Sequence, residues 1–313
     1  MTGVTPTTRV TRAAFASPAR PHRIGGSTMN GFWHHLRLTL KLNFRNPQAV
    51  VFGYAVPVFF LFAIAAFYVK GKNSGPEMAR YMGQLLTITV LGGACFGMPI
   101  AVVSERERGV WRRYRLTPLP TLAFVGSVLL ARYVLVLSAG LIQIALAMWI
   151  YKMPPPLHPW WLWAAFTLVS FAFLAIGLLI CMIANSTHAV QALGQSLFLP
   201  MIIIGGVGVP LSQLPIWGRT LAAFLPGRYA VQAMDPAVYD VSKFNRFFYD
   251  AHHYTAFNYA ALVVIGVAAV LGAVKLFRWE NGQRLGWRAW AWALVTVASW
   301  VALGLWARGH KLV

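Results

Sequence analysis

Residues Met153 to Gly218 read MPPPLHPWWLWAAFTLVSFAFLAIGLLICMIANSTHAVQALGQSLFLPMIIIGGVGVPLSQLPIWG and decide the fold. These roughly 66 residues contain no Lys, Arg, Asp or Glu, whereas one transmembrane helix needs only about 20 apolar residues. The run is therefore too long for a single span. Its polar cluster, Asn185 to His188, divides it into two spans, at about Trp160–Ala184 and Ala189–Val209.

Five further apolar stretches flank this run, and each is long enough to cross a bilayer. We expect them at about Val50–Val69, Tyr81–Val103, Leu122–Tyr151, Tyr254–Phe277 and Ala289–Ala307. The chain is 58% hydrophobic and only 11% charged, less than half the charge of an ordinary soluble domain. The sequence therefore predicts an all-α polytopic membrane protein, with six core spans in residues 48–280 and an additional apolar helix in residues 281–313. This last helix is either a seventh span or a reversed or surface-lying helix, because Arg308 and Lys311 would lie outside if it crossed the membrane.

The amino-terminal segment divides into two parts. Residues 1–28 lack an apolar core and predict a disordered cytoplasmic tail. Residues 29–47 predict an amphipathic helix on the membrane surface, because Trp33, Leu36, Leu40 and Phe44 share one helical face. The alternative is a plain extension of the first span, which Asn46-Pro47 would interrupt.

The charge balance favours a membrane surface over nucleic acid. The chain has 27 Lys and Arg against 7 Asp and Glu, and basic residues collect at the cytoplasmic ends of spans, where lipid head groups are anionic. With a cytoplasmic amino terminus, roughly 16 basic residues fall inside and roughly 10 outside, which supports that orientation. Cys95 and Cys181 both lie in apolar runs, so we expect no metal site.

The segment SERERGVWRRYRLTPLP, residues 104–120, concentrates charge where the second span meets the cytoplasm. Gly109 is expected to end that span, and Trp111–Leu116 to form a short basic helix closed by Thr117-Pro118. Such a helix can dock into a groove of another protein. The alternative is a lipid anchor, which explains the arginines but not Glu105 and Glu107.

The segment GGVGVPLSQLPIWGRTLAAFLPGRYAVQAM, residues 205–234, mixes glycines and prolines with short apolar pieces. It predicts broken helices that re-enter the membrane from the outer side, although a plain extracellular loop is an alternative. Asp235, Asp240 and Asp250 follow it and are expected in the outer loop, where they face water or bind sugar.

Together these two segments resemble the ABC type 2 permease family, the membrane subunits of bacterial exporters. The family's Glu-Arg-Glu-x-Gly element, leading to Thr-Pro, is matched by Glu105, Arg106, Glu107, Gly109, Thr117 and Pro118. Its Pro-Leu-Ser-x-Leu-Pro-x-Trp element is matched by Pro210, Leu211, Ser212, Leu214, Pro215 and Trp217. The resemblance covers roughly residues 33–279.

The resemblance implies a dimer of six-span subunits in a bacterial plasma or inner membrane, each with a coupling helix in the 105–117 loop. Arg112, Arg113 and Arg115 would contact an ATPase, while Glu105 and Glu107 hold the loop to a basic neighbour such as the 33–45 helix. Pro210, Leu211, Leu214, Pro215 and Trp217 would form a re-entrant outer gate.

The sequence contains no G-x-x-x-x-G-K-[ST] phosphate loop. We therefore expect no catalytic residue and no cofactor in this chain; ATP and Mg²⁺ belong to a partner ABC ATPase, present in two copies. Membrane lipids and a second copy of the chain are the other expected partners.

Three alternatives remain open. A membrane-embedded lipid or glycan transferase would need catalytic groups, for which His34-His35 and His252-His253 are weak candidates without acids at useful spacing. A secondary transporter would need an acid at mid-membrane depth, and the expected spans hold none. A polysaccharide exporter is less favoured than an exporter of a drug, lipid or glycolipid, whose path Phe96, Met98 and Phe198 are candidates to line.

Overall fold

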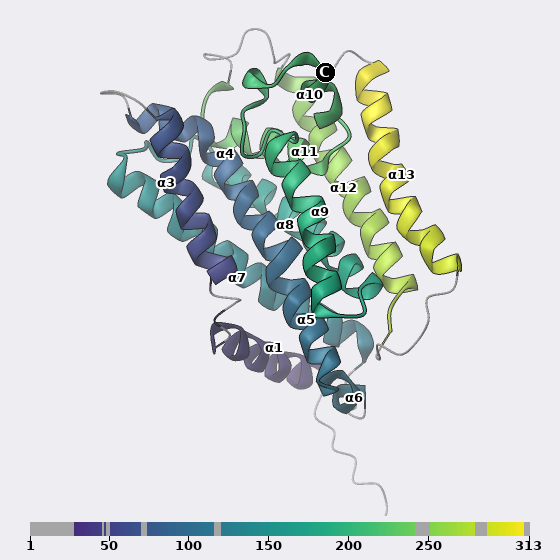
Figure 1. Ribbon diagram of the computed structural model, residues 1–313. Coiled ribbons are helices and arrows are strands. Elements are labelled where there is room, and N and C mark those ends of the chain that lie inside the picture. Colours follow the sequence, from purple (N-terminus) through teal and green to yellow (C-terminus); the bar gives the residue numbers. More distant parts are fainter. Residues whose placement is uncertain are drawn as a thin grey trace, which may run out of the picture.

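The computed structural model describes residues 28–45, 47, 51–69, 74–115, 120–241, 251–278 and 287–309. These residues form an all-helical bundle without a strand (Figure 1). Within these described ranges, five helices are long and apolar enough to cross a membrane: Ser74–Glu107, Thr121–Ile150, Pro159–Ile183, Ala256–Lys275 and Trp290–Gly309. The chain is therefore an all-α, multi-pass membrane protein.

One continuous helix forms the centre of the bundle. It consists of α4 (Ser74–Gly92), a π-helical turn η2 (Gly93–Gly97) and α5 (Met98–Glu107), and its 34 residues extend about 51 Å. Its most apolar window is 100% buried, compared with 22% for the carboxyl-terminal helix, so the other helices pack around it. It is longer at both ends than the expected span, Tyr81–Val103, and therefore includes Glu105 and Glu107 in its last turn.

The three helices that follow lie close to their expected positions. They are α7 (Thr121–Ile150), α8 (Pro159–Ile183) and α9 (Thr187–Ile203). The turn between α8 and α9 falls at the predicted polar cluster, where the Ser186 side chain accepts a hydrogen bond from Ala189 N at 3.2 Å. The expected end of α9 at Val209 is wrong, because Gly206 adopts a φ of +77° and the backbone becomes irregular after Ile203.

The first predicted span is shorter than expected. A π-helical turn η1 (Val51–Ala55) leads into α3 (Val56–Tyr68), with Pro57 in its first turn. A buried polar chain joins this helix to two others: Gln143 Nε2 of α7 donates to Pro57 O at 2.8 Å, and Gln143 Oε1 accepts from Thr89 Oγ1 of α4 at 2.6 Å. These bonds satisfy the polar side chains within an apolar interior.

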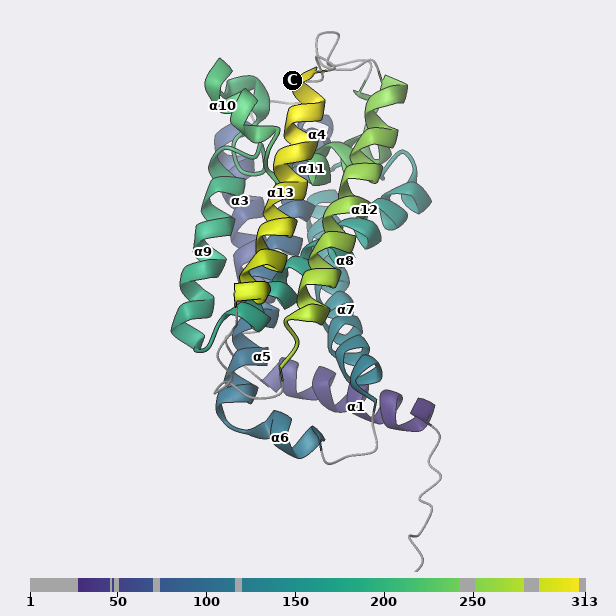
Figure 2. The same cartoon turned by 90° about the vertical axis from the view of Figure 1, so that its right-hand side faces the viewer.

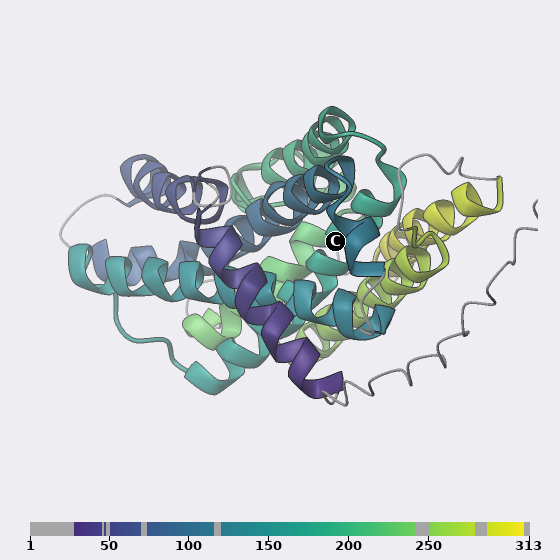
Figure 3. The same cartoon turned by 90° about the horizontal axis from the view of Figure 1, so that it is seen from below.

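Helix α1 (Thr28–Arg45) crosses the lower end of the bundle, which Figure 3 shows from below. It packs against α7, where His35 Nδ1 and Ser127 Oγ lie 2.7 Å apart and the His35 ring contacts Phe124. Burial, together with the neighbouring His34, lowers the pKa of His35, so the neutral ring is favoured. The short helix α6 (Val110–Arg115) lies at this same end.

The opposite end carries short helices, and the carboxyl-terminal pair runs along the bundle (Figures 1 and 2). The 3₁₀ turn η3 (Leu211–Gln213), α10 (Ile216–Ala222) and α11 (Pro226–Val238) form the predicted broken segment, and α11 packs against α4, α8 and α12. Helices α12 (Ala251–Lys275) and α13 (Trp287–Gly309) run side by side (Figure 2). Thr296 Oγ1 of α13 donates to Ala268 O of α12 at 3.3 Å.

Asp235 does not lie in a water-facing loop, contrary to the sequence-based expectation. It belongs to α11 and is buried beside Gly83 of the central helix, where the missing Cβ of glycine leaves space for its carboxyl group. The apolar pattern of α11 faces the core, and Asp235 shares that face. The interior therefore does hold an acid, although not on one of the predicted spans. Asp250 lies outside the described residues.

Candidate functional site

The charged segment at the lower end of the central helix folds as a helix, a tight turn and a second helix. At the end of α5, Arg108 N donates to Ser104 O at 3.0 Å and Gly109 N donates to Arg106 O at 3.1 Å. Gly109 has a φ of +71°, and no atom lies within 4 Å of the position that a Cβ would take. Backbone conformation, not space, therefore requires glycine here.

Trp111 anchors α6 to the bundle. Its side chain is only 1% exposed, and its ring lies edge-on to Phe124 of α7, with 5.0 Å between centroids, and stacks on Phe277 after α12 at 6.0 Å. Arg112 and Arg113, the next two residues, are exposed. The helix therefore buries an aromatic face against the body and turns a cationic face outward.

The other expected residues of this segment are only partly placed. Arg115 ends α6, but its side chain lies outside the described residues, as do Thr117 and Pro118.

Arg106 joins the central helix to the carboxyl end of α8. Its guanidinium is buried, and Nη2 donates to Cys181 O at 2.8 Å and also to Ala184 O. Arg278, after α12, donates through Nη2 to Ile183 O at 3.2 Å and to Ala184 O at 3.0 Å. The last carbonyls of a helix lack intrahelical donors and carry partial negative charge, so both cations stabilise this helix end.

Glu107 joins the central helix to the amino end of α9. Its Oε1 accepts from Thr187 N at 3.1 Å, and its Oε2 accepts from Thr187 Oγ1 at 2.8 Å. Thr187 is the first residue of α9, where free N–H groups and the helix dipole favour an anion. The cation Arg106 thus binds the partly negative carboxyl end of α8, and the anion Glu107 binds the partly positive amino end of α9. We call Arg106, Glu107, Arg278 and Thr187 the helix-end clamp.

Glu105 lies on another side of α5. Its Oε2 accepts from Trp111 Nε1 at 3.4 Å, and its nearby opposite charges are Arg132 of α7 and Arg108. We expected both glutamates to hold the loop to a basic neighbour such as the 33–45 helix. The expectation is wrong for Glu107, which binds Thr187. Glu105 does have a basic neighbour, but this is mainly Arg132 of α7 and not a residue of the 33–45 helix.

The expected outer-gate residues lie together at the opposite end of the bundle. Pro210 is buried, Leu211 and Leu214 are half-buried, and Pro215 and Trp217 are exposed. Arg219 stabilises the turn that carries them, because its Nε donates to Leu214 O and its Nη2 to Ser212 O, both at 2.9 Å.

Gln84 ties the outer segment to the central helix. Its Nε2 donates to Gly206 O at 3.1 Å, so the irregular backbone that follows α9 is held against α4.

Of the three candidate path residues, Phe96 and Met98 are buried and Phe198 is half-buried. Phe96 of η2 packs edge-on against Phe198 of α9, with 5.1 Å between ring centroids. Met98 is fully buried beside α8. All three contribute to packing around the π turn in this arrangement of the helices.

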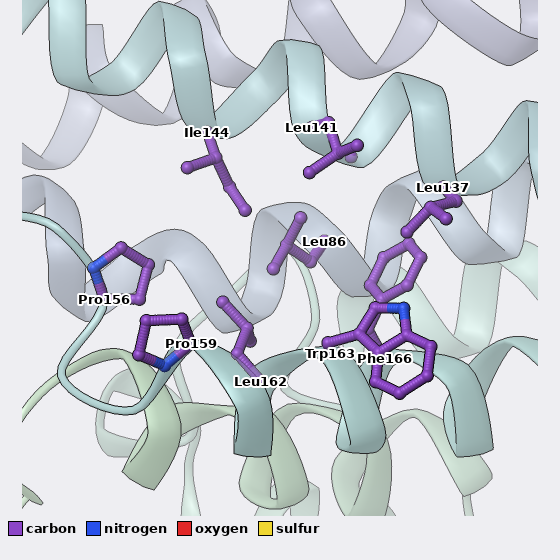
Figure 4. Close-up of a pocket in the computed structure, with 10 residues that line it drawn as sticks. Leu86, Leu137, Leu141, Ile144, Pro156, Pro159, Leu162, Trp163 and Phe166 are labelled. Atoms are coloured by element: carbon purple, nitrogen blue, oxygen red, sulfur yellow. The ribbon is translucent and has the colours of Figure 1, made fainter.

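A hollow of about 200 Å³ lies between α4, α7 and α8 (Figure 4). All its lining residues are apolar: Leu86, Leu137, Gly140, Leu141, Ile144, Pro156, Pro159, Leu162, Trp163 and Phe166. It offers no side chain for acid–base or nucleophilic chemistry. Within the described ranges, no three His, Cys, Asp or Glu residues gather as a metal site would require.

Sequence reasoning missed two residues of the clamp, Arg278 and Thr187, and the basic neighbour of Glu105, Arg132. Arg278 follows the sixth span as one of several basic residues, and nothing in the sequence indicates that it reaches α8. Thr187 falls in the predicted turn, but its contact is 80 residues away in the chain. Arg132 offered a usable signal, because it is the only charge in its apolar run.

Comparisons with known proteins identify a family for most of the chain. The family model described as ABC-2 type transporter matches residues 30–239, which include the helix-end clamp apart from Arg278, and the outer segment. A comparison with curated proteins found no match.

Proposed function

The chain belongs to the ABC-2 type transporter family, and on that premise we propose that it is the permease subunit of an exporter for hydrophobic or amphipathic substrates. Family membership makes it the membrane component of an ABC transporter, which is not itself an ATPase and works with an ABC ATPase subunit. The direction of transport, the substrate class of drug, lipid or glycolipid, a dimer of this chain and two ATPase copies belong to our proposal. So do the bacterial inner membrane and the cytoplasmic amino terminus.

The observation that carries the proposal is the connection between α6 and the helix-end clamp. The exposed Arg112 and Arg113 offer a cationic surface to an acidic groove of the ATPase. Trp111 fixes α6 to the bundle, and Gly109 joins it to the central helix. A push on α6 would therefore reach α8 and α9 through the Arg108–Gly109 turn, Arg106 and Glu107.

In this mechanism the chain performs no bond chemistry. Closure of two ATPase subunits on ATP would move the two α6 helices, and each clamp would move the α8–α9 turn with its central helix. Alternating access then follows from rigid movements of the two membrane halves. The segment from Pro210 to Trp217, at the far end, would open and close the outer side.

The test is co-purification of the ATPase with the full-length chain. The tagged chain is solubilised gently, and proteins recovered in near-equal amount are identified by mass spectrometry. We expect a stoichiometric ATPase with the unchanged chain and its loss with Arg112→Ala, Arg113→Ala and Arg115→Ala together. Lys152→Ala serves as the control, because Lys152 is an exposed cation in the α7–α8 connection, away from α6. Absence of an ATPase from every sample would overturn the proposal.

A second experiment separates docking from transmission of movement. Glu105→Gln together with Glu107→Gln should leave membrane insertion and ATPase binding intact, while ATP hydrolysis no longer drives transport. Reconstituted complexes would be assayed for both activities, first with amphipathic drugs and lipids and then with polysaccharide. Unchanged transport in this variant would remove the coupling role from the two glutamates. If polysaccharide, and neither drugs nor lipids, stimulated ATP hydrolysis and was transported, the alternative substrate class would be favoured.

A further inference from the structure

A second hollow, with a volume of about 620 Å³, lies between α1, the lower part of α5 and the start of α6. It is separate from the helix-end clamp, which faces α8 and α9. Its walls come from the surface helix on one side and from the central helix on the other. The hollow therefore lies at the end of the bundle where a membrane surface would meet the chain (Figures 1 and 3).

The lining is divided evenly between two kinds of side chain. Leu42, Pro47, Ile100, Ala101 and Val110 are apolar, whereas Asn43, Arg45, Ser104, Glu105 and Arg108 are polar or charged. Both walls carry apolar and polar side chains, and such a mixed lining matches an amphipathic ligand better than a free ion.

Asn43 supplies an unused hydrogen-bond donor. Its side chain is only 5% exposed, and its Nδ2 has no hydrogen-bond partner among the residues that the structure describes. A buried donor without an acceptor is unfavourable. Because Nδ2 is itself buried, an acceptor bound in the hollow would remove this cost once the Asn43 side chain turns toward it.

The charges of the lining favour an anion. Arg45 and Arg108 are exposed at the hollow, so their guanidinium groups can approach a ligand. Glu105, the acid of the lining, accepts from Trp111 and has both Arg132 and Arg108 as nearby opposite charges. Arg45, Arg108 and Arg132 outnumber Glu105, so the surroundings of the hollow are net positive, which suits phosphate oxygens.

We propose that this hollow binds the phosphate head group of an anionic membrane lipid from the cytoplasmic leaflet. Arg45, Arg108 and Asn43 Nδ2 donate to the phosphate, and the first carbons of the lipid lie against Leu42 and Ile100. The assignment to the cytoplasmic leaflet depends on the orientation given under the proposed function. The exposure of Leu42 and Phe44 on α1, 47% and 55%, supports a lipid neighbour over a protein partner.

The experiment measures lipid binding to the purified full-length chain in detergent. Fluorescent phosphatidylglycerol is titrated against the unchanged chain, with fluorescent phosphatidylcholine as the neutral lipid. We expect phosphatidylglycerol to bind about tenfold more tightly, and Arg45→Gln with Arg108→Gln to abolish that preference. Asn43→Leu, which keeps the size but removes the donor, should weaken phosphatidylglycerol about fivefold.

Arg37→Gln is the matched control, because Arg37 is an exposed cation of the same helix that does not line the hollow. The affinity of the Arg37→Gln variant for phosphatidylglycerol should stay within twofold of that of the unchanged chain. Size-exclusion chromatography and circular dichroism establish that every variant is folded. An equal loss in the Arg37 variant would overturn the proposal, because it would show general attraction to a basic surface.

Two further outcomes identify a different ligand. Complete displacement of the lipid by millimolar inorganic phosphate would overturn the lipid assignment in favour of a free anion. Loss of the ATPase, with unchanged lipid binding, in the Arg45 and Arg108 variant would assign the hollow to the protein partner. Because lipid binding needs no ATPase, its failure is distinguishable from failure of the proposed transport function.

Discussion

The central helix holds the same two neighbours, α8 and α9, in two places and by different means. At its π turn, the backbone carbonyls of Ala94 and Cys95 lie against Gly177 of α8 and Gly194 of α9, where a Cβ would overlap them. At its lower end, Arg106 and Glu107 reach the termini of the same helices.

The difference follows from the surroundings of each contact. Deep in an apolar bundle, close backbone approach provides van der Waals contact without burying a charge. Near the membrane surface, charges are tolerated and can use the dipoles of helix ends. The π turn thus acts as a fixed support, whereas the clamp is the contact whose strength depends on charge.

The largest expected effect comes from adding one methyl group at the support. In Gly177→Ala the new Cβ would overlap Ala94 O and lie 3.0 Å from Met98 Cε, and neither the backbone carbonyl nor the packed helix can easily move. We expect the free energy of unfolding to fall by about 2–3 kcal/mol. Thermal unfolding in detergent, followed by the fluorescence of the 13 tryptophans, measures it.

The control for this prediction is Gly126→Ala in α7, where the nearest atom would be Phe32 Cε2 at 3.8 Å. Here the melting temperature should hold or rise slightly, because alanine is the better helix former. Similar losses in both variants would mean that helix packing at Gly177 is not special.

Removal of the clamp's buried cation should have the next largest effect. Arg106→Ala leaves Cys181 O without its guanidinium donor in a buried site, and we expect about 1.5–3 kcal/mol of lost stability. Arg113→Ala, an exposed cation of α6, should leave the melting temperature unchanged. If the two variants melt alike, Arg106 is solvated and does not hold α8.

Gly109 tests the link between the clamp and α6. Alanine at a φ of +71° is expected to lower stability by about 1 kcal/mol, although the surrounding space is open. Asparagine tolerates the left-handed region better, so Gly109→Asn should recover part of the loss. The two melting curves decide whether conformation sets the cost; a worse result for the larger asparagine would instead indicate crowding.

Much of the bundle was predictable from the sequence, because apolar length alone identifies spans. The boundaries of α7 and α8 fall within a residue of the expectation for this reason. The charged segment was also predictable, since Glu105, Glu107 and Gly109 interrupt an apolar pattern.

The partners of these charges were not predictable. Glu107 meets Thr187, and Arg278 meets Ile183, only after four helices have packed, and no local periodicity encodes such distant contacts. Asp235 was misplaced for the same reason, because the space beside Gly83 exists only in the folded bundle. The pattern of apolar residues thus predicts the helices, whereas the contacts of the clamp depend on tertiary packing.

The smallest expected effect, from Glu107→Gln, separates the clamp from the support most sharply. Glutamine can still accept from Thr187 through one oxygen, so the variant loses mainly the interaction between a full charge and the start of α9. Because Glu107 is exposed, solvent screens this interaction, and we expect about 0.3–1 kcal/mol at low ionic strength.

Salt should decide the origin of this difference. Melting temperatures of the Glu107→Gln variant and the unchanged chain should converge as salt rises from low to molar concentration, since the Debye length falls to about 3 Å. The deficit of Gly177→Ala, which is steric, should persist across the same series. A salt-independent deficit in the Glu107 variant would show that hydrogen-bond geometry, and not charge, holds α9. The lower contact would then be a fixed support like the upper one, rather than a contact whose strength depends on charge.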